Sequence, residues 1–326
     1  MEQKSVLIGM SGGVDSSVAA ALLKEQGYHV IGATMRLWTY SDSCNMKHEG
    51  CCAESAVEDA RRVCDKLGID FYVMNFKDMF KDKVVDYFVD EYIHGRTPNP
   101  CIACNKYLKF DALLKKALAM GIDYVATGHY AKIEKGEDGK YILRASEAVK
   151  KDQSYVLYNF TQEQLAHTLM PLGGYNKDWV RQKAEELGLG VAHKPDSQEI
   201  CFVEDDDYAK FITDYSGYKP KEGDILDVNG NVIGKHRGLI YYTIGQRKGI
   251  GAYGRPMFVM KIDAENNTIT LGEKGMEFSN ELTAYDVNFV SGEFPKENML
   301  ITAKVRYQAP PAAAMPVSYT HLTLPT

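Results

Sequence analysis

The sequence predicts an α/β protein in which a doubly wound, mostly parallel sheet is followed by small β-barrel domains. Strand-like and helix-like segments alternate through the first half of the 326 residues, a pattern typical of parallel sheets. After about Tyr208 the chain changes to short β-rich runs separated by glycine and asparagine turns. Such runs are typical of small antiparallel barrels or sheets. The length suffices for about two or three domains.

The first half contains four predicted strands and the helices that connect them. The apolar run Val6-Leu7-Ile8 is the first strand, and an apolar stretch over 18–23 continues the helix after it. The further strands are predicted over 29–37, 71–74 and 124–127. The further helices are predicted over 53–67, 77–93 and 107–120. Ligands in such sheets bind beyond the carboxyl ends of the strands.

A glycine-rich turn, GMSGGVDSS over 9–17, joins the first strand to the first helix. This arrangement is an anion site, because glycine lets the backbone approach phosphates and a helix N-terminus presents N–H groups. Ser11, Ser16 and Ser17 would add hydroxyl donors. The turn lacks the Gly-Lys-Ser/Thr of a Walker A element, which argues against γ-phosphoryl transfer. SGGVDSS resembles the pyrophosphate-binding loop (PP-loop) of ATP pyrophosphatases, which split ATP between the α and β phosphates.

Four segments are expected along the chain. Residues 1–208 are expected to form a PP-loop catalytic domain, and 209–277 a central β-rich domain with hairpins at Asn229-Gly230 and Asn266-Asn267. Residues 278–316 are expected to be a truncated C-terminal β-barrel with an unpaired edge after about Arg306. Residues 317–326 back-translate to the end of a transposon-based sequencing adapter, so we expect a non-native tail that packs against nothing.

Composition and charge limit the location and the partners. The first residues hold no basic-then-apolar signal, and no apolar window is long enough to span a bilayer, so cytoplasm is expected and no membrane partner. A formal net charge of −6 argues against a uniformly basic, nucleic-acid-binding surface. It leaves room for a local basic patch.

Cysteine spacing gives the second strong motif, TPNPCIACN over 97–105. Cys101 and Cys104 are expected just before a helix that begins near Asn105, where the helix dipole favours a thiolate. DSQEICF over 196–202 adds Cys201. By itself a C-x-x-C pair is a zinc half-site, a redox pair or chance.

The other cysteines have plainer interpretations. Cys64 lies on the apolar stripe of its helix and is predicted to be a buried core residue. A polar loop holds Cys44, Cys51 and Cys52 with His48 between them. This set could bind a metal, although adjacent cysteines are awkward tetrahedral ligands.

Five motifs together resemble the family of tRNA-specific 2-thiouridylases, enzymes that thiolate the wobble uridine (position 34) of tRNA. They are SGGVDSS, TPNPCIACN, GHYA over 128–131, KDQSY over 151–155 and DSQEICF, in this order. The resemblance extends from Lys4 to about Pro316. It implies ATP-dependent adenylation of the uridine C-2 oxygen and sulfur transfer from a persulfide.

The resemblance implies roles for individual residues. Cys104 would be the nucleophile and disulfide partner, and Cys201 the persulfide carrier. ATP would be held by Gly9, Met10, Ser11, Gly12, Gly13, Val14, Asp15, Ser16, Met35 and Gly128. The target base would be lined by Asn99, Pro100 and Cys101, the last of which is an aspartate in some relatives. The tRNA contacts would be His129, Lys151, Asp152, Gln153, Arg306 and Tyr307.

The same resemblance implies cofactors and partners. ATP is the cosubstrate, and Mg²⁺ is expected with the pyrophosphate. The implied partners are the anticodon stem-loop of tRNA and a sulfur donor such as a cysteine desulfurase or a relay protein. A monomer is expected.

Three alternative functions remain open at this stage. Cys101, Cys104 and Cys201 could instead be ligands of an iron–sulfur cluster in a related tRNA thiolase. The chain could be another ATP pyrophosphatase, such as an amidotransferase synthetase or a lysidine synthetase, which would not need the cysteines. The third alternative is a non-catalytic tRNA-binding protein, in which an intact PP-loop would have no function.

Overall fold

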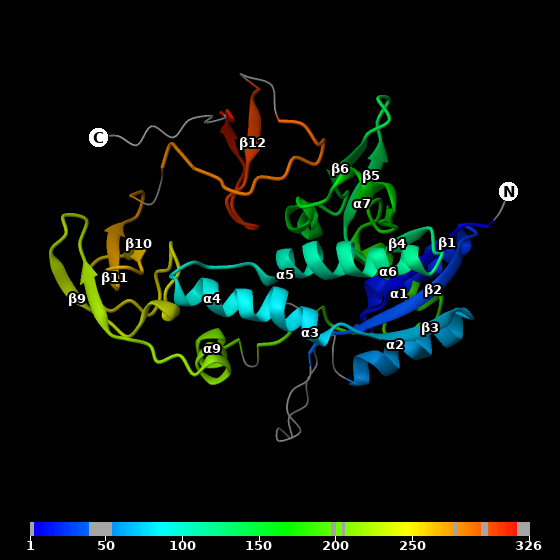
Figure 1. Cartoon of the computed structure of the whole chain (residues 1–326), viewed down its shortest axis with the longest axis horizontal. Coiled ribbons are helices and arrows are strands. Elements are labelled where there is room, and N and C mark those ends of the chain that lie inside the picture. Colours follow the sequence, from blue (N-terminus) through cyan, green and yellow to red (C-terminus); the bar gives the residue numbers. More distant parts are fainter. Residues whose placement is uncertain are drawn as a thin grey trace.

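The computed structural model describes residues 3–38, 54–196, 200–203, 206–276, 279–294 and 299–317. The loop with Cys44, His48, Cys51 and Cys52, and the end of the chain from 318, lie outside these residues. The described part divides into a large α/β unit and smaller β units (Figure 1). None of the helices in the described ranges has both the length and the apolar character that crossing a bilayer requires.

A five-stranded parallel sheet forms the centre of the α/β unit, as predicted. Its order is β3 (Asp70–Asn75), β2 (His29–Arg36), β1 (Ser5–Gly9), β4 (Tyr124–Ala126) and β7 (Thr168–Leu169). Every pair in it is parallel. The winding direction reverses between β1 and β4, and ligands of doubly wound sheets bind at such a reversal, beyond the carboxyl ends of the strands.

Helices cover both faces of this sheet, which explains why Val6, Leu7 and Ile8 are all fully buried. Val6 and Ile8 pack on one side and Leu7 on the other, because successive strand residues point to opposite faces. The first face carries α1 (Val14–Glu25), α2 (Glu54–Leu67) and α8 (Lys177–Glu186). The second face carries α3 (Lys77–Phe80), η1 (Lys81–Asp86), α4 (Tyr87–Ile93), α5 (Pro100–Ala103), η2 (Cys104–Ala112), α6 (Leu113–Ala119) and α9 (Tyr208–Ser216).

One helix starts earlier than predicted. The prediction that a helix begins near Asn105, after both cysteines, is wrong: the helical run begins at Pro100 and continues through α5, η2 and α6. The Asn99 side chain caps it by accepting a hydrogen bond from the Cys101 backbone N–H at 3.0 Å. Proline suits the first turn of a helix, so Pro100 here starts the helix and does not delay it.

A β-hairpin and several short turns separate β4 from α8. The hairpin consists of β5 (Ala131–Lys135) and β6 (Tyr141–Ala145). The turns that follow are η3 (Val149–Lys151), η4 (Ser154–Leu157) and α7 (Gln162–Ala166). They share a small core in which Phe110, Leu157 and Phe160 are buried.

The central β unit is a four-stranded sheet ordered β10 (Met257–Asp263), β11 (Thr268–Glu273), β8 (Gly223–Leu226) and β9 (Val232–His236). The two predicted hairpins form, at Asn229-Gly230 and at Asn266-Asn267. The predicted antiparallel pairing is confirmed within both hairpins, whereas β11 and β8, which join the hairpins, run parallel. Turn residues determine the pairing within each hairpin but not how two hairpins join.

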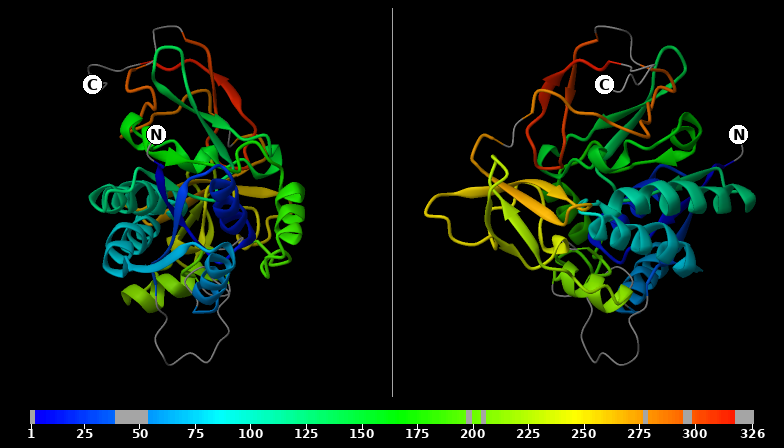
Figure 2. Two further views of the ribbon diagram at one scale, coloured as in Figure 1. Left: turned by 90° about the vertical axis from the view of Figure 1, so that its right-hand side faces the viewer. Right: turned by 60° about the vertical axis from the view of Figure 1, so that its left-hand side comes forward.

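The central unit packs on the end of α4. Ile240, in η5 (Leu239–Tyr241), is fully buried in the same core as α4 and α9. Thr97 donates a hydrogen bond to Thr243 at 3.1 Å. Farther along, β12 (Ile301–Ala303) and β13 (Ala312–Ala314) form a two-stranded ribbon above the α/β unit (Figure 2). Within the described residues no third strand pairs with it, so the ribbon has the open edge predicted after about Arg306.

Candidate functional site

The phosphate loop lies at the carboxyl end of β1, where the sheet reverses direction. Gly13 precedes α1 in an extended conformation. Because glycine has no side chain, no side-chain hydrogen bond caps the N–H groups at the start of α1. Gly12 has φ +70°, and a Cβ there would overlap the carbonyl of Ala56 on α2. A Cβ on Gly128 would lie 2.7 Å from the backbone nitrogen of Ser16. The lack of a Cβ at Gly12 and Gly128 therefore lets α2 and the segment after β4 approach the loop and the start of α1 closely.

The loop serines differ in what they offer a ligand. Ser11 is exposed, and the buried Ser16 hydroxyl accepts a hydrogen bond from the Ser11 N–H at 3.2 Å. Ser17 is fully buried and donates to the Gly13 carbonyl at 2.8 Å. The Ser16 hydroxyl donates to the same carbonyl, at 3.2 Å, so the part that these two hydroxyls play in phosphate binding stays a prediction.

Met35 and Gly128 lie at the ends of the two strands that flank β1. Met35 is the penultimate residue of β2, is half-buried, and pairs with Met74 of β3. Gly128 follows β4 and contacts the start of α1, as its close approach to Ser16 indicates. The topology thus brings the predicted ATP residues to one edge of the sheet.

His129, beside Gly128, is held by the Thr127 hydroxyl at 2.7 Å from its Nδ1. Its ring centroid is 5.8 Å from that of Phe110. Burial lowers the pKa of His129 well below 6.5, and the nearby Lys109 charge lowers it further. His129 is therefore neutral at pH 7 and offers hydrogen bonding or stacking to a ligand, not a positive charge.

An ion-pair network links the phosphate loop to the segment that leads to Cys201. Lys177, the first residue of α8, contacts both carboxylate oxygens of Asp15, at 2.7 and 2.8 Å, and Asp196 Oδ1 at 2.6 Å. The Tyr130 hydroxyl also donates to Asp15, at 2.7 Å. Partial burial would raise the pKa of Asp196, but hydrogen bonds from Lys151 and Lys177 hold that pKa below its usual value.

The three cysteines of the two motifs differ in exposure. Cys101 is exposed in the first turn of α5, and Cys104 is buried one turn later, at the start of η2. Cys201 is half-buried and packs on the same core cluster that contains Cys104. The fold therefore brings Cys104 and Cys201 to one region of the molecule, although 97 positions separate them in the sequence.

Two anchors position Cys201. On its C-terminal side Phe202 is 1% exposed, with its ring 5.2 Å from Phe88 and 5.6 Å from Phe80 between centroids. On its N-terminal side Asp196 is held by the ion pairs described above. Aromatic packing thus holds the residue directly after the thiol, and ion pairs hold Asp196, five positions before it.

The predicted tRNA residues 151–153 are already engaged within the protein. Lys151 pairs with Asp196 at 2.7 Å, and the Asp152 carboxylate accepts from the Ser154 hydroxyl at 2.6 Å. The Gln153 side-chain oxygen accepts from the Tyr130 N–H at 2.9 Å. These side chains fix the turn after the β5–β6 hairpin against the phosphate loop.

Arg306 and Tyr307 lie between β12 and β13 and join that ribbon to the rest of the molecule. Arg306 donates to the Ile244 carbonyl at 2.5 Å, and the Tyr307 hydroxyl donates to the Asp152 carbonyl at 3.0 Å. The rings of Tyr155 and Tyr307 lie 6.0 Å apart between centroids. Tyr307 therefore comes next to the segment 151–153, and the ring of His129 lies near that of Phe110.

Cys64 is a core residue, as predicted. It is fully buried, and a Cβ on Gly32 would lie 2.6 Å from its sulfur. Burial raises the pKa of the Cys64 thiol to about 12, and the neighbouring Asp65 carboxylate adds to the shift. Such a thiol is protonated and unreactive at neutral pH.

The donor set does not fit an iron–sulfur cluster. In the ranges that the structure describes, no three His, Cys, Asp or Glu side chains are arranged to hold a metal ion, and that includes Cys101, Cys104 and Cys201. The loop with Cys44, Cys51 and Cys52 lies outside those ranges, so its predicted metal site stays a prediction.

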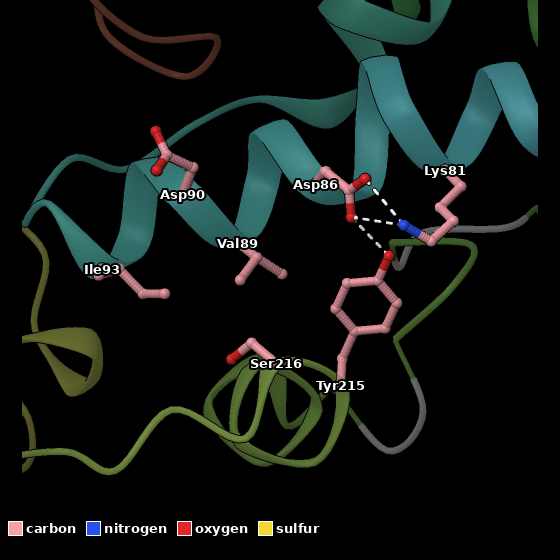
Figure 3. A pocket seen from close by; sticks show the side chains of 7 residues that line it. All are labelled: Lys81, Asp86, Val89, Asp90, Ile93, Tyr215 and Ser216. Atoms are coloured by element: carbon pink, nitrogen blue, oxygen red, sulfur yellow. Dashed lines mark hydrogen bonds and ion pairs between the residues drawn. The ribbon is translucent and has the colours of Figure 1, made fainter.

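An open depression of about 450 Å³ lies elsewhere, between α4 and α9 (Figure 3). Tyr215 and Lys81 both bind Asp86 on its wall, at 2.5 and 3.0 Å. None of the residues that line it belongs to the motifs. We therefore place the candidate site at the sheet edge and not in this depression.

Sequence reasoning gave no role to Lys177, Tyr130 or Asp196. Tyr130 and Asp196 belong to the GHYA and DSQEICF motifs, so their position in those motifs was a usable signal. Lys177 belongs to no motif and follows Asn176, an ordinary helix cap. Nothing in the local sequence distinguishes it from Lys183, the other lysine of α8.

Comparisons with known proteins agree with this geometry. Residues 4–205 match the family model of the tRNA methyl transferase HUP domain, and residues 209–273 match that of the tRNA methyl transferase PRC-barrel domain. The chain is 59% identical over 313 residues to the tRNA-specific 2-thiouridylase MnmA of Clostridioides difficile (strain 630), covering 95% of this chain and 86% of that protein. It is 58% identical over 318 residues to the tRNA-specific 2-thiouridylase MnmA of Acetivibrio thermocellus, covering 97% and 89%.

A solved 4-thiouridine synthetase–RNA complex with bound ATP matches at a TM-score of 0.38 and 18% identity, covering 59% of this chain and 43% of that chain. A likeness this distant carries no argument.

Proposed function

The chain belongs to the tRNA-specific 2-thiouridylase family, and we propose that it replaces the C-2 oxygen of the wobble uridine of tRNA with sulfur. The protein is an ATP-dependent tRNA sulfurtransferase. One observation supports the roles proposed for these segments. Lys177 forms ion pairs both with Asp15 of the phosphate loop and with Asp196, five positions before Cys201.

In the proposed mechanism ATP binds with its phosphates at the N-terminus of α1. The uridine C-2 oxygen attacks the α phosphorus, the bond to the pyrophosphate oxygen breaks, and N3 loses its proton. This step converts a poor electrophile into one with AMP as the leaving group. Mg²⁺ would accompany the phosphates, and Asp15 supplies a carboxylate at the loop to hold it.

Sulfur transfer uses the two cysteines. A persulfide on Cys201 presents its terminal sulfur to C-2, and AMP departs with the C–O bond electrons. Cys104 then attacks the Cys201 sulfur, which closes a disulfide between them and leaves the second sulfur on the base. The pair returns to two thiols only with an external thiol reductant, and the persulfide needs an external sulfur donor. Thiolates are the reactive forms in these steps.

The base pocket would lie at the start of α5, which Asn99, Pro100 and Cys101 form, one turn before Cys104. An anticodon base reaches such a pocket only when it is unstacked, as in other enzymes that modify single-stranded bases. The remaining tRNA contacts are proposed at His129, at 151–153 and at Arg306–Tyr307. Their support is that Tyr307 and Asp152 lie together across a large sequence separation.

The test measures the nucleotide products and the modified base in the same reaction. Protein, tRNA, ATP, Mg²⁺ and a low-molecular-weight persulfide, which transfers its outer sulfur to the Cys201 thiolate, should yield 2-thiouridine, detected by mass spectrometry of digested tRNA, with AMP and pyrophosphate in equal amounts. Formation of ADP and phosphate as the dominant products would contradict the adenylation step. Thiolation without ATP would contradict the role of the phosphate loop.

A further inference from the structure

The central β unit contains a long stretch that is rich in basic residues and free of acidic ones. The whole chain has 44 Asp and Glu residues in 326, yet none of them lies in the range 228–262. The same range contains six lysines and arginines: Lys235, Arg237, Arg247, Lys248, Arg255 and Lys261. A chain with a net charge of −6 therefore has a local excess of positive charge in this stretch, and such an excess attracts a polyanion.

Four of these six cations are already engaged within the protein. Three form ion pairs with carboxylates, at 2.5 to 3.0 Å: Lys235 with Asp224, Arg255 with Glu273, and Lys261 with Asp263. The fourth, Arg237, lies over the ring of Tyr241, 4.0 Å from its centroid. Their positive charge or their stacking surface is used inside the central unit.

The other two cations, Arg247 and Lys248, lie in the turn 243–249, which we call the basic turn. Both side chains are exposed, and neither forms an ion pair or a hydrogen bond with any residue in the described part of the chain. Two adjacent cations without a carboxylate partner repel each other and are stabilised when an anion binds to both. The basic turn is therefore the part of the stretch that can accept an anion without breaking an existing pair.

The backbone of the basic turn is held in a fixed shape. The Gln246 side chain accepts a hydrogen bond from the Thr243 N–H at 2.9 Å and donates one to the Lys248 carbonyl at 2.9 Å. Gly245 and Gly249 have φ of +83° and +76°, in the left-handed region that favours glycine. An anion that binds here needs to order only the two side chains and not the turn itself.

The basic turn lies beside the proposed base pocket. Thr97, two positions before Asn99, donates a hydrogen bond to Thr243 at 3.1 Å, where the chain that joins α4 to α5 meets the central unit (Figure 1). The next residue of the turn, Ile244, accepts a hydrogen bond from Arg306 through its carbonyl. An RNA loop whose base entered the pocket at Asn99 would therefore bring neighbouring phosphates close to the turn.

We propose that Arg247 and Lys248 bind phosphates of the tRNA anticodon arm and hold the arm while its wobble base enters the pocket. This inference rests on the proposed function, because it takes the tRNA of that reaction as the partner. A guanidinium binds two phosphate oxygens at once, and an ammonium binds as a point charge. Phosphate contacts position a nucleic acid and carry no sequence information, so both cations are positioning residues, and base contacts elsewhere select the target.

The experiment measures the Kd for a stem-loop RNA of the anticodon arm at several salt concentrations, without ATP or a sulfur donor. Arg247→Ala/Lys248→Ala should reduce the slope of log Kd against log salt by about 2, one for each lost phosphate contact. Each single variant should reduce it by about 1. Arg247→Lys/Lys248→Arg keeps both charges and should keep most of the slope. The affinity for ATP should not change in any of these variants.

Lys235→Ala/Arg255→Ala is the matched control. It removes two positive charges from the same stretch, but both side chains are paired with carboxylates, so the slope should equal that of the unaltered protein. Thermal unfolding measures whether both double variants are folded. If Arg247→Ala/Lys248→Ala is not, the two single variants decide the outcome.

Two results would overturn the proposal. One is a slope in the variants of the basic turn equal to that of the unaltered protein. The other is an equal reduction in the control, because a general loss of positive charge would then explain the effect. The binding measurement needs no chemistry, so a protein that bound the RNA through the basic turn yet failed to thiolate tRNA would refute the proposed function alone. Thiolation by a protein whose slope did not depend on the basic turn would refute this inference alone.

Discussion

The four described cysteines differ in burial. Cys64 is fully buried in the core of α2, whereas Cys101 is exposed and Cys201 is half-buried. Cys104 is buried in the core cluster against which Cys201 packs. The environment of each thiol, more than its motif, decides which can exchange sulfur.

Serine substitutions of these cysteines should separate the two classes. Cys104→Ser and Cys201→Ser should each abolish thiolation, because neither hydroxyl carries or displaces sulfur, while ATP affinity stays within about twofold. Cys64→Ser should retain thiolation but lower the free energy of unfolding by about 1–3 kcal/mol, since it buries a hydroxyl in an apolar place. Mass spectrometry of tRNA, nucleotide titration and thermal unfolding measure the three quantities. Thiolation by Cys201→Ser would remove the persulfide mechanism.

The low pKa of His129 has a consequence for stability. Because the folded state disfavours the charged imidazole, the unfolded state binds more protons between the folded pKa and 6.5. The contribution of His129 to stability is therefore complete above pH 6.5 and is lost as the pH falls toward the folded pKa. Denaturant unfolding at pH 7.5 and 5.5 should show a smaller acid loss for His129→Gln than for the unaltered protein. His193→Gln, whose side chain is 86% exposed, is the control, and an equal acid loss in both variants would contradict the interpretation.

At the scale of elements, the start of α5 places both cysteines of its motif and the residues proposed to contact the target base. Asn99 holds that start by accepting from the Cys101 N–H, and Pro100 fits the first turn. The cap therefore positions Cys104 one turn away. Asn99, which we propose to contact the base, therefore also caps the helix that carries Cys104, the proposed nucleophile.

Two substitutions separate these roles of Asn99. Asn99→Ala should lower stability by about 1 kcal/mol through loss of the cap, and should lower thiolation as well. Asn99→Ser keeps a capping oxygen but changes the surface offered to the base, so it should restore stability without restoring full thiolation. Thermal unfolding and the thiolation rate measure both. Full activity in Asn99→Ser would show that Asn99 acts as a cap and does not contact the base.

Sequence patterns predicted the elements well where one local signal determines them. The parallel sheet, the phosphate loop and the Asn-Gly hairpin follow from periodicity and turn residues. The start of α5 was mispredicted because Pro100 reads equally as a breaker and as a first-turn residue. The parallel contact of β11 with β8, and the partners of Lys177, depend on packing between distant segments that no local pattern encodes.

At the scale of the whole molecule, the proposed tRNA surface is assembled from three distant segments. The ribbon around Tyr307 reaches the 151–153 turn through the Asp152 carbonyl, and Arg306 reaches the central β unit through Ile244. Within the segment 151–153, Lys151 forms an ion pair with Asp196. The ribbon, the central unit and the catalytic unit therefore share contacts that tRNA would span.

Binding of tRNA across these units should be strongly salt-dependent, despite the net charge of −6, because local lysines and arginines release counterions from phosphates. Arg306→Ala should weaken tRNA binding and reduce the slope of log Kd against log salt by about 1, the effect of losing one phosphate contact. ATP affinity should not change, because Arg306 lies on the ribbon and not at the phosphate loop. Arg255→Ala is the matched control: Arg255 is also exposed but pairs with Glu273 at the edge of the central sheet, so it should leave the slope unaltered. Equal slopes for Arg306→Ala and the unaltered protein would mean that the tRNA phosphates bind elsewhere, and that Arg306 serves only to join the ribbon to Ile244.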